Sequence, residues 1–232
     1  MRTGVYSIFF LLLVFVTANA QQDSSYYLKA KQAFKQENCK EAIENFTKDL
    51  ALNPKRTVSL YARALCYRQL GKLDKSVEDL QAILKLDSAN VDAMNALGDT
   101  YRLRNENKKA IQLFDRALVF DSNAREVYNN RGLAYEALKD YAEAEKNYIQ
   151  ANNFSPDADC YVNLGRTYLK MKQYEKALQA ANRAIELNGE SKDAYTLRSM
   201  AYLELDEFDK SDEDAKKAKS LKQTKKLCDE CH

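Results

Sequence analysis

The sequence predicts an all-α protein in which six helix-turn-helix hairpins stack into a solenoid. Two observations carry this prediction. The 232 residues include only six Gly and two Pro and no Trp, and so few helix breakers favour helices joined by short turns. Small residues also return every 33 or 34 positions, which indicates an internal repeat. These small residues are Ala30, Ala64, Gly98, Gly132, Gly165 and Ser199.

Three further sets of residues recur in the same register. A second set of small residues comprises Ala42, Ser76, Ala110, Ala144, Ala177 and Ser211. An aromatic set comprises Tyr67, Tyr101, Tyr135, Tyr168 and Tyr202, and a set that begins with large residues comprises Phe46, Leu80, Phe114, Tyr148, Ala181 and Ala215. Pro54 and Pro156 share one position after the second helix, where Pro ends a helix because it cannot continue one.

The third unit illustrates how each repeat is expected to fold. Met94, Leu97 and Tyr101 recur at helical spacing and predict one apolar face. A polar turn over 104–107 separates this helix from a second one, whose apolar positions lie between 110 and 118. Small residues on both helices allow a close approach, and the aromatic residues fill the space beside them.

The order of small residue, Tyr, Ala, aromatic residue and Pro at this interval resembles the tetratricopeptide repeat. The residues that match are Gly98, Tyr101, Ala110, Phe114 and Ala117 in the third unit, Gly132, Tyr135, Tyr141, Ala144, Tyr148, Ala151 and Pro156 in the fourth, and Gly165, Tyr168, Tyr174, Ala177 and Ala184 in the fifth. The outer units match less well, for example with Asp49 and Ile83 where Ala is usual. Terminal repeats are expected to deviate because one side of them faces solvent.

The resemblance implies a right-handed superhelical solenoid whose concave groove is lined by the first helix of each hairpin. The array would span residues 21–225, in units of about 23–56, 57–90, 91–124, 125–157, 158–191 and 192–225. It would act as a protein-protein interaction scaffold that binds a peptide or protein partner in the groove, without enzymatic activity.

A polar strip on the first helices is the candidate peptide-binding groove. Its residues are Tyr61, Asn95, Arg102, Asn129, Asn130, Asn163 and Arg166. Asn is a poor residue inside a helix, so its recurrence needs another reason, and an amide can both donate to and accept from a peptide backbone. Arginine can hold a carboxylate by paired hydrogen bonds. The alternative is that all seven are ordinary solvated surface groups.

The first 20 residues have the pattern of a secretory signal peptide. Arg2 precedes a short apolar run over 5–16, and a small-residue stretch ends at Ala20. The run is shorter than the roughly 20 residues of a spanning helix, although an uncleaved anchor is the alternative. We therefore expect an exported protein, periplasmic or extracellular, or in the endomembrane lumen or secreted if the source is eukaryotic. No integral membrane segment is expected after residue 20.

The charge balance argues against nucleic acid as a partner. The chain has 36 basic and 34 acidic residues, a formal net charge of +2. A nucleic-acid-binding protein needs a clear excess of basic residues on one surface. The lysines near the end of the chain follow an acidic stretch within one predicted helix, which is typical of a solvated capping helix.

The tail over 226–232 carries the competing functional hypothesis. Cys228, Cys231 and His232 fit the Cys-x-x-Cys-His pattern of c-type haem attachment. A local disulfide, a free dithiol or a metal-binding tail would also fit, and we expect no haem because the match is the pentapeptide alone. The alternative function is therefore a thiol-redox or c-type haem-bearing accessory protein. Cys39, Cys66 and Cys160 are expected to pack as small core residues, although a Cys39–Cys66 bridge is conceivable.

No catalytic or metal-binding residues are predicted. His232 is the one His, so a His-based general base would have to use the last residue. The glycines are isolated and form no phosphate-binding loop. No cluster of His, Asp and Glu has metal-ligand spacing.

Overall fold

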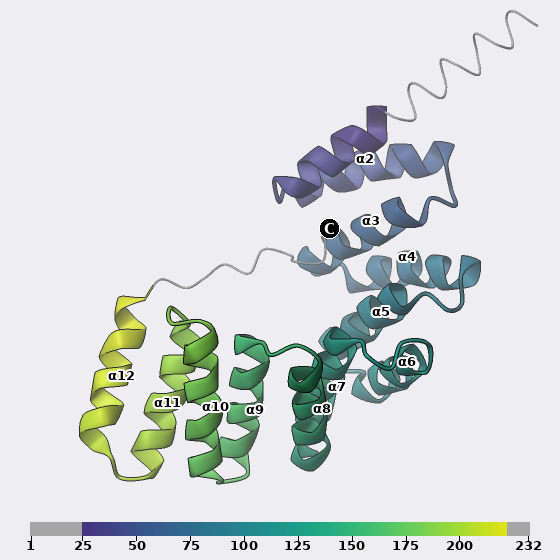
Figure 1. Ribbon diagram of the computed structural model, residues 1–232. Coiled ribbons are helices and arrows are strands. Elements are labelled where there is room, and N and C mark those ends of the chain that lie inside the picture. Colours follow the sequence, from purple (N-terminus) through teal and green to yellow (C-terminus); the bar gives the residue numbers. More distant parts are fainter. Residues whose placement is uncertain (1–24, 222–232) are drawn as a thin grey trace, which may run out of the picture. The chain divides into compact units, whose positions relative to one another are not determined.

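The computed structural model describes residues 25–221, which form α-helices and short turns without a strand (Figure 1). A first helix covers residues 25–35. The later helices are α2 (Cys39–Leu52), α3 (Thr57–Gln69), α4 (Leu73–Leu86), α5 (Val91–Leu103), α6 (Asn107–Phe120), α7 (Arg125–Ala137), α8 (Tyr141–Phe154), α9 (Ala158–Lys170), α10 (Tyr174–Leu187), α11 (Lys192–Glu204) and α12 (Phe208–Ser220). The predicted all-α fold of six hairpins is confirmed within these residues.

The chain divides into two compact units, Met1–Asn105 and Glu106–His232. The first unit holds the helix over 25–35 and α2 to α5, and the second holds α6 to α12. The division falls in the turn of the third predicted hairpin. In the second unit α9, α10, α11 and α12 lie side by side, and each contacts the next (Figure 1).

Each of the six hairpin turns contains one residue with a left-handed backbone. These residues are Glu37, Gly71, Asn105, Lys139, Lys172 and Asp206, with φ between 57° and 69°. In five of these turns the next N–H reaches back to a carbonyl near the end of the first helix, as from Gln173 to Tyr168 over 2.9 Å. This bond satisfies a carbonyl that the helix end leaves without a partner. Only one of the six positions is Gly, although other residues adopt this backbone at a cost of about 1–2 kcal/mol.

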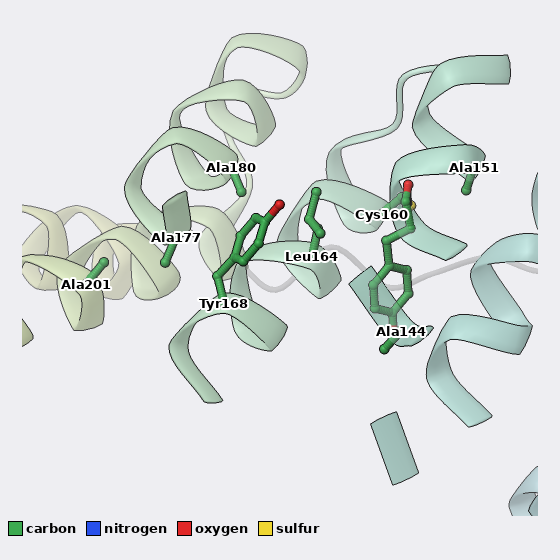
Figure 2. Close-up of a cluster of buried hydrophobic side chains, with 9 residues drawn as sticks. Ala144, Ala151, Cys160, Leu164, Tyr168, Ala177, Ala180 and Ala201 are labelled. Atoms are coloured by element: carbon green, nitrogen blue, oxygen red, sulfur yellow. Dashed lines mark hydrogen bonds between the residues drawn. The ribbon is translucent and has the colours of Figure 1, made fainter. Parts of the chain in front are cut away.

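The core of the second unit alternates small and large side chains. Ala144, Ala151, Ala177 and Ala201 are fully buried, together with Tyr148, in the cluster drawn in Figure 2. Tyr148 fills the space beside Gly132, where an added Cβ would lie 2.7 Å from the ring. The repeated small residues therefore mark the sites of closest helix approach, as their register predicted.

Three arginines join neighbouring hairpins. Arg63, Arg131 and Arg198 lie on the first helices of alternate repeats, and each bonds the second helix of its own hairpin and that of the hairpin before it. Arg198, for example, bonds Asp214 over 2.7 Å and Asn182 over 2.8 Å. The contacts hold adjacent hairpins in register.

The repeats between them use apolar residues at the equivalent positions. Leu97 and Leu113 occupy these positions in the third repeat, and Leu164 and Ala180 occupy them in the fifth. All four are buried. This position is therefore polar in the second, fourth and sixth repeats, whereas in the fifth repeat it is apolar and lies in the core.

Candidate peptide-binding surface

The first helices of the second unit present one face to solvent, here called the second-unit face. It consists of positions spaced by three or four residues on α7, α9 and α11, which share a side of each helix. The residues are Glu126, Asn129, Leu133 and Glu136 on α7, Asp159, Val162, Asn163, Arg166 and Leu169 on α9, and Asp193, Thr196, Met200 and Leu203 on α11. Because α9 contacts both α7 and α11, the three rows lie next to one another. Val162 is buried, and the others are half-buried or exposed.

Two predicted groove residues meet across helices on this face. Asn163 Nδ2 donates to Asn129 Oδ1 over 3.2 Å, which joins α9 to α7. An Asn side chain has two donor hydrogens and an acceptor oxygen. The bond uses one donor of Asn163 and one lone pair of Asn129, so most of the bonding capacity of the pair remains for a ligand. Asn130 is also half-buried on α7.

Arg166 joins the next pair of helices. Its Nη2 lies 3.5 Å from Asp193 Oδ2, and the two side chains are 50% and 59% exposed. An ion pair in so much water is weak and exchanges easily with a ligand. Arg166 thus remains able to contact a peptide, but a neighbouring carboxylate already attracts it.

One predicted residue of the first unit, Arg102, already binds a carboxylate of the chain. Arg102 Nε donates to Asp99 Oδ1 over 2.8 Å, and Arg68 Nη1 donates to Asp99 Oδ2 over 2.9 Å. Asp99 is therefore held between α3 and α5 by two guanidinium groups. Tyr61 and Asn95 are half-buried on the same two helices. A ligand carboxylate would have to compete with Asp99 for Arg102.

Leu133, Leu169 and Leu203 on the second-unit face were missed from the sequence. Each occurs in an apolar helical pattern, and leucine in such a pattern is usually assigned to the core. The sequence feature that could have identified them is their spacing of three or four residues from other residues on the same side of each helix. Leu203 is 52% exposed, so this face is partly apolar.

The described cysteines are free and buried, so they pack in the core as expected and the alternative Cys39–Cys66 bridge is not formed. Cys39 Sγ instead donates to Gln69 Oε1 over 2.9 Å, so the thiol is used in a hydrogen bond. Burial, as the main cause, raises the pKa of Cys160 to about 12. The reactive form of a thiol is the thiolate, so Cys160 is suited to packing and not to redox chemistry. Within residues 25–221 no group of three His, Cys, Asp or Glu side chains is placed to hold a metal ion.

The haem or dithiol tail lies outside the described residues. The proposed role of Cys228, Cys231 and His232 stays a prediction from the sequence. In the part of the chain that the structure covers, no helix combines the length and apolarity needed to cross a bilayer.

Comparison with known families decides the identity of the repeat. A model of the tetratricopeptide repeat protein 21 C-terminal ARM domain matches residues 16–192, and a tetratricopeptide repeat model matches residues 192–225. The chain belongs to the tetratricopeptide repeat family. The recognition made from the repeated residues is therefore confirmed, and the tetratricopeptide array extends through the last described hairpin.

Several curated relatives share the array. BBSome complex member BBS4 from Bos taurus is 24% identical over 66% of this chain and 30% of its own length. DnaJ homolog subfamily C member 7 from Mus musculus is 26% identical over 70% and 36%. Mitochondrial import receptor subunit TOM70 from Homo sapiens is 24% identical over 83% and 34%. The chain spans about a third of the length of these relatives.

Solved structures agree on the fold. A tetratricopeptide repeat protein from Parabacteroides merdae matches with a TM-score of 0.73 and 21% identity, over 88% of this chain and 80% of that one. YrrB, described as a tetratricopeptide protein with an unusual peptide-binding site, matches with a TM-score of 0.58 and 20% identity, over 77% and 93%. At this identity the likeness concerns the fold alone.

The expectation of an exported, periplasmic or extracellular protein is wrong. The curated relatives BBS4, DnaJ homolog subfamily C member 7 and TOM70 are not exported proteins. The prediction rested on a basic residue followed by a short apolar run. This pattern shows that the segment is hydrophobic, but it does not determine where the protein is located. The segment over 1–20 itself lies outside the described residues.

Proposed function

We propose that this tetratricopeptide array is a non-catalytic scaffold that binds a peptide segment of a partner protein on the face of its first helices. The observation that carries the proposal is the pair Asn129 and Asn163, which meet across two helices on a half-buried surface. Such a pair offers donors and an acceptor at a fixed separation. An extended peptide backbone presents the complementary groups along its length.

The relatives support binding as the role of the array. BBS4 is by name a member of a complex, TOM70 is a receptor subunit, and YrrB is described with a peptide-binding site. Each is similar to this chain in its helical repeats. The repeats are therefore the part that these proteins have in common with it.

A selection from a library of random extended peptides tests the proposal. The full chain is used to select binders, and the dissociation constant of the best peptide is then measured for the chain and for the Asn129→Ala/Asn163→Ala variant. Replacing each amide by Ala removes about one net hydrogen bond to the peptide. We therefore expect the affinity for the peptide to fall about tenfold. Helical circular dichroism should be unchanged.

Asn153→Ala is the matched control, because Asn153 is an exposed amide on the second helix α8. This variant should bind as the parent chain does. Equal affinity for the double variant and the parent would refute the second-unit face as the binding site. Failure to select any peptide would refute peptide binding itself.

A further inference from the structure

The second-unit face ends in an uncovered apolar area. Met200 and Leu203 on α11 are each 52% exposed, and Leu169 on α9 is half-buried beside the core cluster. Leu203 and Leu169 occupy equivalent positions in their repeats, so the area continues from one helix to the next. Burial of this surface by a ligand would be favourable in proportion to the area removed from water.

The opposite edge of the same face is acidic. Glu126, Asp159 and Asp193 are the acidic residues in the first turns of α7, α9 and α11. Glu126 pairs with Arg125 over 2.8 Å with a side chain that is 54% exposed, and Asp193 pairs with Arg166 over 3.5 Å. Both pairs are open to water, so ligand cations can join or replace their partners. A ligand that fits this face combines apolar with basic side chains.

The distance between the rows restricts the shape of the ligand. Helices that pack directly lie about 8–10 Å apart, and α9 contacts both α7 and α11, so we expect the acidic residues in their first turns to recur at about that interval. A polyproline II segment turns once every three residues and rises about 3.1 Å per residue, or about 9 Å per turn. Every third side chain of such a segment points the same way. One of its sides can therefore meet the acidic edge while another meets the apolar area.

From this match we infer that the second-unit face binds an extended, polyproline-II-like segment with a basic residue at every third position and apolar residues on a neighbouring side. The inference rests on the proposed function and specifies its ligand. Asn129 and Asn163, between the two edges, then hold the peptide backbone. The acidic edge and the apolar area determine which sequences are accepted.

Three labelled synthetic peptides test the inference by fluorescence anisotropy with the full chain. The first repeats the triplet lysine–leucine–proline three times, the second replaces lysine by glutamate, and the third replaces leucine by serine. We expect the first to bind about tenfold or more tightly than either of the others. Its affinity should fall as salt rises from low to high concentration, because exposed charge pairs are screened.

Variants of the chain locate the two contributions. Glu126→Gln/Asp193→Asn should weaken binding of the first peptide and reduce its salt dependence. Met200→Ser/Leu203→Ser should weaken binding while the salt dependence stays. Glu186→Gln and Leu187→Ser, exposed positions on α10, are the matched controls and should leave binding unchanged.

Two results would overturn the inference without touching the proposed function. One is equal or tighter binding of the glutamate peptide. The other is a pool of library peptides that binds through Asn129 and Asn163 but has no enrichment of basic residues at every third position. Loss of library binding altogether would instead count against the proposed function.

Discussion

Gly165 lies at a point of very close helix approach in the second unit. An added Cβ would lie 2.4 Å from Leu197 Cδ2 and 3.3 Å from the Cβ of Ala180. Leu197 and Ala180 are both buried, so neither can move away into solvent. The absence of a side chain at position 165 is therefore a packing requirement.

We expect Gly165→Ala to destabilise the protein. The helix gains about 1 kcal/mol from the replacement of Gly, but overpacking of a dense core costs about 1–3 kcal/mol. The net loss of about 1 kcal/mol would lower the melting temperature by about 2–4 °C. Thermal unfolding followed by circular dichroism measures it.

Gly189→Ala provides the comparison, because the nearest atom to its added Cβ is 3.9 Å away. This variant should melt at the parent temperature or slightly above it. A melting temperature for Gly165→Ala that equals that of Gly189→Ala would show that the space beside Leu197 is not restrictive.

At the scale of elements, the inter-hairpin arginines explain how repeats with different residues at the helix contacts can still stack in the same way. Asp214 is a buried carboxylate on α12 whose charge is compensated by Arg198. The fifth repeat has Leu164 and Ala180 at these positions and packs them in its core (Figure 2). A charged pair and an apolar pair are both stable at these two positions, provided that the two residues match in polarity.

We predict that Arg198→Leu alone destabilises the protein by about 3 kcal/mol, since it leaves Asp214 buried without its partner. Arg198→Leu/Asp214→Leu should recover most of this loss, because it reproduces the apolar pair of the fifth repeat. Urea unfolding of the two variants and the parent measures the difference. If the single variant is no less stable than the double one, the buried pair is not the cause.

The turn of the third hairpin was predictable from the sequence. The expected turn over 104–107 in the third unit is observed between Leu103 and Asn107. The left-handed residues in the turns were not predictable. Glu37, Lys139 and Lys172 have side chains that disfavour this backbone, and the packing of the two flanking helices imposes it.

At the scale of the whole molecule, the family assignment places the chain among repeat proteins. It covers about a third of the length of the curated relatives, in BBS4, DnaJ homolog subfamily C member 7 and TOM70 alike. The partner must therefore be found through the chemistry of the face.

The tail provides the test of the competing function. We expect the purified full chain to be colourless, because its match to a c-type haem attachment site is the pentapeptide alone. An absorption spectrum measures this directly. A Soret band that disappears in a Cys228→Ala variant would contradict the expectation and support the haem-bearing alternative.

The sequence by itself determined the number of hairpins, their length and their family. This was possible because one pattern of small and aromatic residues recurs several times in register. A chance match at a single position therefore does not change the assignment of the repeat. The tertiary structure alone decided which polar residues meet. The Asn129–Asn163 bond, the Asp99 cluster and the Arg198–Asp214 pair each join different helices, and such contacts depend on how neighbouring hairpins pack.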